Sequence, residues 1–87
     1  MSYRVEFRPA ALREMRRIPR PLNARLMAAI SALAEVPRPP GCVRLQGPEG
    51  FHRVRVGDYR IVYLIEDRAL LVCVVRVGHR REVYRGL

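Results

Sequence analysis

A nearly continuous aliphatic run at residues 70–77 places the strongest constraint on how this chain folds. Its length and composition are typical of a strand that is covered on both faces. Two segments with alternating apolar residues precede it, at 51–56 and 59–65. Gly57-Asp58 separates these two as a tight turn, and Glu66-Asp67-Arg68 forms the next turn. The last part of the chain is therefore expected to form three antiparallel strands.

The first part of the chain predicts one short strand and two helices. Residues 3–8 alternate in the manner of a half-buried strand. Pro9 suits the first turn of a helix over residues 10–18, which Pro19 then ends. Pro21 can open a second helix that runs to about residue 35, with a loop to follow. The short connection makes the two helices a hairpin.

The resulting order of elements, β-α-α-β-β-β, predicts an α+β fold. A small antiparallel sheet should carry the N-terminal helical hairpin on one of its faces. The length of 87 residues, with no linker, predicts a single domain over residues 1–87. Residues 82–85 are expected to form either a short final strand or a turn.

Charge is the most prominent feature of the composition. Seventeen basic residues, all of them arginine, stand against eight acidic ones, which leaves a net charge of +9. A biased base composition of the genome would explain arginine in place of lysine, but not the excess of positive charge. The expected partner is a polyanion: nucleic acid, an acidic protein or a membrane surface.

The remaining composition favours a cytoplasmic protein without a metal or cofactor. Cys42 and Cys73 are far apart and belong to no CxxC pair, so neither a zinc site nor a disulfide framework is predicted. The first residues lack an apolar signal region, and no apolar stretch is long enough to span a bilayer. The acidic residues are too scattered for a two-metal nuclease site.

Alternation in segment 51–56 points to a basic sheet face. Arg53 and Arg55 lie on one side of this strand, and Val54 and Val56 lie on the other. If the valines face the helices, both arginines stand on the opposite, open face. Arg60 begins the neighbouring strand just across the predicted turn.

Further arginines, Arg76, Arg80 and Arg81, come from the end of the last long strand. Guanidinium groups from separate segments are thus expected to converge on one side of the sheet, where their forks match phosphate oxygens and stabilise charge in phosphoryl transfer. The predicted contacts to an RNA backbone are Arg53, Arg55, Arg76 and Arg81. The alternative for each is an ordinary solvated arginine, and for Arg60 an ion pair with Asp58 or Glu82.

Three other side chains are candidates for chemistry. His52 and His79 have the pKa range of general bases, but each is equally consistent with a plain surface histidine. Tyr84 can stack on a base or close the core. No Ser-His-Asp set, glycine-rich phosphate loop or HExxH motif is present. The residues by themselves support a nucleic-acid binder.

Two blocks of the sequence resemble the signature blocks of RelE-family toxins. They are FHRVRVGDYRIVY at residues 51–63 and VRVGHRREVY at residues 75–84. The opening strand, the two helices and the Pro-Arg-Pro loop are also similar, so the resemblance covers essentially the whole chain.

The resemblance implies the toxin of a type II toxin–antitoxin pair. Such a toxin cleaves mRNA in the ribosomal A site by attack of the substrate's own 2′-hydroxyl, without a metal. The implied partners are a cognate antitoxin, mRNA and the ribosome with its 16S rRNA, and no cofactor or membrane. The catalytic residues carried over from the family are Arg53, Arg55, Arg60, Arg80 and Tyr84, with Arg81 next to the matching block.

One departure from the family concerns the general base. The best-known relatives carry lysines at the positions of Arg53 and Arg55, and arginine hardly ever loses its proton in a protein. Tyr84, His79 or the ribosomal RNA remain as alternatives for that role, and a further alternative is a reaction that depends on electrostatic stabilisation alone. ParE toxins share the fold but inhibit DNA gyrase, which is the alternative function, and an inactive relative serving as a binding module is a third.

Overall fold

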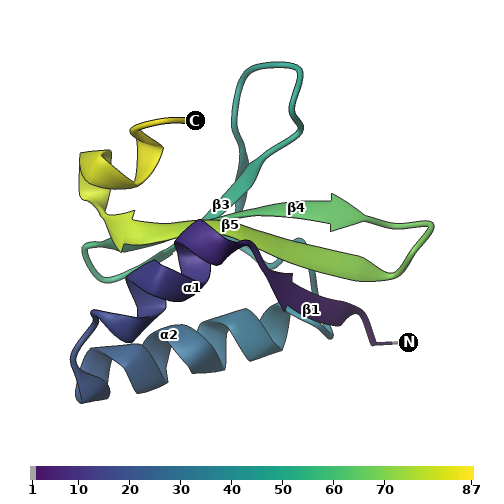
Figure 1. Ribbon diagram of the computed structural model, residues 1–87. Helices are drawn as coiled ribbons and strands as arrows, with labels where there is room; N and C mark the ends of the chain where they lie inside the picture. Colours follow the sequence, from purple (N-terminus) through teal and green to yellow (C-terminus); the bar gives the residue numbers. More distant parts are fainter. Residues whose placement is uncertain (1) are drawn as a thin grey trace.

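The computed structural model describes residues 2–87 as two layers, a five-stranded sheet with both α-helices on one face (Figure 1). The order of strands across the sheet is β1-β5-β4-β3-β2. The α+β fold with a helical hairpin against the sheet is therefore confirmed. In chain order the elements are β1 (Arg4–Phe7), α1 (Pro9–Arg16), α2 (Arg20–Leu33), β2 (Val43–Arg44), β3 (His52–Val56), β4 (Tyr59–Glu66), β5 (Leu71–His79) and the 3-10 helix η1 (Arg80–Tyr84).

Three details of the sheet and the C-terminal segment differ from the prediction. β1 pairs with β5 in parallel, so the sheet is mixed rather than wholly antiparallel. The expected loop contains the two-residue strand β2, which pairs with β3. For the last residues the sequence left a short strand or a turn open; they form the 3-10 helix η1, because the chain turns off the sheet at Arg80 with a φ of 38°.

Prolines mark the start of both helices of the hairpin, and one side-chain hydrogen bond connects the two helices. Pro9 and Pro21 lie in the first turns of α1 and α2, where a missing N–H leaves no hydrogen bond unmade. The Asn23 amide donates to the backbone carbonyl of Met15 over 2.7 Å. This bond joins the start of α2 to the end of α1.

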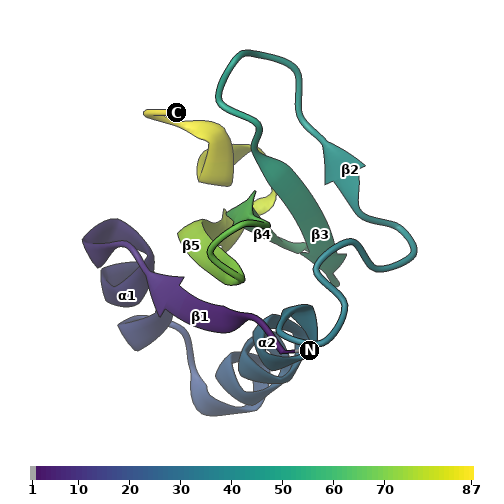
Figure 2. The ribbon, with the colours of Figure 1, turned by 90° about the vertical axis from the view of Figure 1, so that its right-hand side faces the viewer.

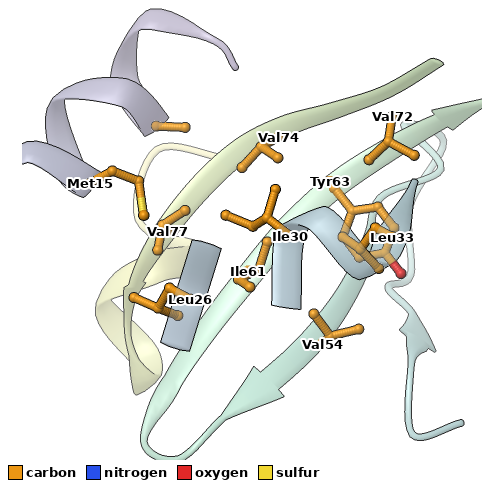
Figure 3. Packing of buried hydrophobic residues seen from close by; sticks show 11 residues of the cluster. Met15, Leu26, Ile30, Leu33, Val54, Ile61, Tyr63, Val72, Val74 and Val77 are labelled. Carbon is orange, nitrogen blue, oxygen red and sulfur yellow. The ribbon is translucent and has the colours of Figure 1, made fainter. Parts of the chain in front are cut away.

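The core lies between the helices and the sheet (Figure 3). α2 contributes Leu26, Ile30 and Leu33 at helical spacing, and none is more than 1% exposed. α1 adds Ala11 and Met15. The strand residues that meet these helices are Val54 of β3, Ile61 and Tyr63 of β4, and Val72, Val74 and Val77 of β5.

A bulge in β5 decides which of its side chains face the helices. Tyr63 pairs with Val74 and Val62 pairs with Arg76, so Val75 is an extra residue in the ladder. Without it, simple alternation from Val74 would turn residue 76 toward the core. The extra residue returns Val77 to the core and leaves Arg76 outside it.

A polar cluster closes the end of the sheet at the β4–β5 turn. Asp67 accepts hydrogen bonds from the Tyr3 hydroxyl at 2.7 Å and from both terminal nitrogens of Arg38 at 2.9 and 3.2 Å. These bonds lower the pKa of Asp67 to about 2. The other end, at the β3–β4 turn, carries most of the predicted site.

Within residues 2–87 no helix combines the length and apolarity needed to cross a membrane.

Candidate functional site

The β3–β4 hairpin brings two arginines face to face. Its turn consists of Gly57 and Asp58, and only Gly57 has a positive φ, 59°, as a two-residue type II′ turn requires. In the resulting register Arg55 is paired directly with Arg60. Directly opposed like charges repel each other across a ladder, so this pair favours an anion between or above its guanidinium groups.

The end of β5 folds back over the same face. Arg80 has a φ of 38°, a left-handed conformation that costs a non-glycine residue roughly 1–3 kcal/mol. The N–H of Arg80 donates to the carbonyl of Asp58 over 2.8 Å, which ties this bend to the β3–β4 turn. In η1, Val83 is fully buried, and it anchors the helix against β4 and β5. The bend therefore places the side chains of η1 beside the arginines of the hairpin.

These elements enclose a polar depression of about 320 Å³, here named the arginine hollow. Its lining contains five guanidinium groups and one carboxylate. The lining residues are Arg53, Arg55, Asp58, Arg60, Arg80, Arg81 and Tyr84. The structure therefore brings together all five residues carried over as catalytic, and Arg81 with them.

Most of the charge in the arginine hollow is not neutralised. Asp58 lies 3.6 Å from Nε of Arg80, but both side chains are more than 60% exposed, so water screens this pair. The predicted alternative for Arg60, an ion pair with a carboxylate, is not formed among the described residues; its Nη1 donates instead to the Tyr59 carbonyl at 3.4 Å. Nε of Arg53 is buried and has no hydrogen-bond partner in the described part of the chain. A buried donor without an acceptor is costly, and a ligand oxygen would satisfy it.

Arg76, which the sequence placed with these side chains, does not line the arginine hollow. Its Nε and Nη2 donate to the Glu14 carboxylate at 3.0–3.2 Å, and its Nη1 donates to the carbonyl of Arg85. Glu14 also accepts from the N–H of Val77 at 3.0 Å. Arg76 thus links α1 to β5 and to the segment after Tyr84.

The two histidines also lie outside the lining of the arginine hollow. His52 contacts Tyr63, with ring centroids 5.8 Å apart, and burial lowers its pKa. His79 packs edge-on against Tyr59, with its Nε2 4.0 Å from an Asp58 oxygen. Among residues 2–87, no three His, Cys, Asp or Glu side chains gather where they could hold a metal ion.

Tyr84 and Asp58 are the two residues of the lining that are not arginines. Tyr84 is 36% exposed, and Val83 rather than Tyr84 is the buried side chain of η1. The sequence predicted Asp58 as a turn residue and as a possible ion-pair partner of Arg60, and not as part of the site. Its position in a tight turn between two arginine-bearing strands was the available signal that it would border the same depression.

A family profile described as the ParE toxin of the type II toxin–antitoxin system parDE matches residues 5–84. The chain belongs to the RelE/ParE superfamily of type II toxins. It is 34% identical to Toxin RelG of Mycobacterium tuberculosis over 86 residues, which cover 98% of this chain and 99% of that relative. It is 31% identical to Toxin RelE of the same organism, over 95% of this chain and 87% of that one.

Solved structures of related toxins have the same fold as this toxin. The RelBE2 toxin–antitoxin complex from Mycobacterium tuberculosis contains a chain with a TM-score of 0.80 and 29% identity, matched over 92% of this chain and 100% of that chain. The isolated RelE toxin of E. coli also gives a TM-score of 0.80, at 26% identity, over 92% of this chain and 86% of that chain.

Proposed function

We propose that this toxin is an endoribonuclease that cleaves messenger RNA in the ribosomal A site, and hence acts in the cytoplasm. The observation that carries the proposal is the arginine hollow. Five arginines and a tyrosine meet there around a single carboxylate. Arg55 and Arg60 face each other without a carboxylate partner among the described residues, an arrangement that a bound phosphate would stabilise.

The proposed reaction uses a nucleophile inside the substrate. The 2′-oxygen loses its proton and bonds to the adjacent phosphorus, and the bond from phosphorus to the 5′-oxygen breaks. The leaving 5′-oxygen takes up a proton, so the products are a 2′,3′-cyclic phosphate and a 5′-hydroxyl. The guanidinium groups of Arg53, Arg55, Arg60 and Arg80 stabilise the negative charge that builds up on the phosphorane. Arg81 extends the positive surface for the RNA backbone.

The proposal predicts cleavage of a defined message on programmed ribosomes. Naked RNA should be cut poorly, because the arginine hollow is a shallow surface depression that cannot bend the RNA by itself. The assay adds purified toxin to ribosomes with a chosen codon in the A site and maps the ends of the message by primer extension. An intact message with every A-site codon would refute the proposal.

Inhibition of DNA gyrase is the second candidate, because the matching family description is that of ParE toxins. A gyrase supercoiling assay with the same toxin preparation separates the two functions. We expect no inhibition. Inhibited supercoiling beside an uncut message would replace the nuclease with the gyrase function.

We also propose that a cognate antitoxin, probed as the product of the adjacent open reading frame, binds and silences this toxin. Related toxins were solved in complexes with antitoxins. A net charge of +9 attracts an acidic partner. An apolar groove of about 410 Å³ between α2 and the loop at residues 39–41 would accept an amphipathic segment. Co-expression should yield a stable complex and restore growth, and a product that neither binds nor rescues would contradict the prediction.

A further inference from the structure

A second depression, of about 360 Å³, lies on the other side of Tyr84. It is named the loop pocket here. The loop between β2 and β3 forms one wall and the segment after η1 forms the other; both lie on the face of the sheet opposite the helices (Figure 2). The residues that line it are Leu45, Gln46, Glu49, Phe51, Tyr84 and Leu87.

The loop that forms one wall of the pocket has a defined shape. The N–H of Leu45 donates to the carbonyl of Phe51 over 2.8 Å and closes the loop at its base. Gly47 has a φ of 117°, and a Cβ at this position would lie 2.6 Å from Oε1 of Glu49. Oε1 of Glu49 lies close to the backbone of Gly47, whose φ is one that favours glycine. The Glu49 side chain is exposed and lines the pocket, so its carboxylate is free to accept hydrogen bonds from a ligand there.

The loop pocket combines apolar walls with two polar groups. Leu45, Phe51 and Leu87 supply flat or aliphatic surface, while Gln46 and Glu49 supply hydrogen-bonding groups. Single-stranded RNA is recognised by this combination, in which a splayed base rests on aromatic or apolar side chains and its edge is hydrogen-bonded.

Tyr84 connects the two depressions, because it lines both the arginine hollow and the loop pocket. A nucleotide places its phosphate and its base on either side of one sugar. A phosphate in the arginine hollow would therefore bring a neighbouring base past Tyr84 toward the loop pocket. The continuity of the two sites points to RNA as the occupant.

We propose that the loop pocket is a subsite for one nucleobase of the message and that Glu49 selects the base. This inference rests on the proposed ribonuclease function. A carboxylate only accepts hydrogen bonds, so it favours an edge that donates them. Guanine offers N1–H and its N2 amino group side by side, a match for both oxygens of Glu49. Uracil instead presents carbonyl oxygens beside its single N–H. Glu49 therefore selects guanine over uracil.

The test compares the toxin with its Glu49→Gln variant on programmed ribosomes. The messages differ by a single base, guanine or uracil, at each position next to the cut in turn. Loss of the carboxylate should reduce the preference for guanine at one position by about tenfold to a hundredfold, the discrimination of one bidentate side chain–base contact. Preferences at the other positions should stay unchanged.

Glu66→Gln is the matched control, because Glu66 is an exposed carboxylate at the far end of β4. It makes the same change of charge and should leave every base preference as it is. Equal preferences in the toxin and the Glu49→Gln variant, or an equal shift in the Glu66→Gln control, would overturn the inference. Failure of the unsubstituted toxin to cut any message would instead remove the ribonuclease function on which the inference rests.

Discussion

Alanine in place of Arg60 or Arg80 is expected to abolish toxicity and leave the fold intact. Both guanidinium groups line the arginine hollow, where the proposed mechanism has them stabilise the developing phosphorane. Loss of one preorganised donor for such a charge typically slows a reaction by about a hundredfold to a thousandfold. Growth arrest on induction and cleavage on programmed ribosomes measure this effect.

The expected stability of each variant follows from the contacts at its position, which are the Arg55–Arg60 pair for Arg60 and the backbone hydrogen bond to Asp58 for Arg80. Arg60→Ala removes the repulsion between Arg55 and Arg60, so its thermal midpoint should stay equal or rise slightly. Arg80→Ala keeps the backbone bond to Asp58 and should change stability by about 0.5 kcal/mol or less. Arg68→Ala, at an exposed turn residue outside the hollow, is the matched control and should remain toxic. A variant at position 60 or 80 that melts normally and still arrests growth would count against the site.

The periodicity of the sequence was sufficient to predict the sheet face that carries the site. Alternation in β3 separated Arg53 and Arg55 from Val54, and a two-residue turn fixed the position of Arg60 across from them. These are local properties of a hairpin, and they hold whatever the rest of the fold does. The helical hairpin was predictable for a similar reason, since prolines mark where each helix can begin and end.

Arg76 shows what the local sequence cannot reveal. The aliphatic run gives no sign of the bulge at Val75 that keeps Arg76 outside the core, and the ion pair with Glu14 then holds its side chain away from the arginine hollow. Its partner Glu14 is 62 residues away in the sequence. Neither fact could be derived without the pairing of β5 with β4 and its packing against α1.

The C-terminal turn and the loop pocket could not be predicted from the sequence for a different reason. Arg80 adopts a positive φ that its residue type does not favour, held by a backbone bond to Asp58 and by the burial of Val83. Tertiary contacts thus override the local preference for a strand or simple turn. The same fold-back brings Tyr84 and Leu87 opposite the loop at Gln46 and Glu49, a juxtaposition that spacing in the sequence cannot reveal.

A message with a 2′-deoxy sugar at the cleavage site is expected to resist this toxin completely. Arginine is a poor base and a poor nucleophile, because it keeps its proton in proteins. The lining of the arginine hollow contains neither serine nor cysteine that could attack phosphorus. The proposed mechanism therefore takes the attacking oxygen from the RNA itself. A single deoxy substitution removes it without changing the phosphate that the proposal assigns to the arginines.

The ends of the cut message give an independent reading of the same mechanism. Attack by the 2′-oxygen leaves a 2′,3′-cyclic phosphate on one fragment and a 5′-hydroxyl on the other, which mass spectrometry and kinase labelling distinguish from a 5′-phosphate. Normal cutting of the deoxy message, or fragments with a 5′-phosphate, would require an external nucleophile and defeat the mechanism.

Tyr84→Phe separates the two roles open to Tyr84, since the ring still stacks on a base but no longer carries a hydroxyl. Retained cleavage in this variant would assign Tyr84 to stacking, and a loss of about a hundredfold or more would assign it to proton transfer.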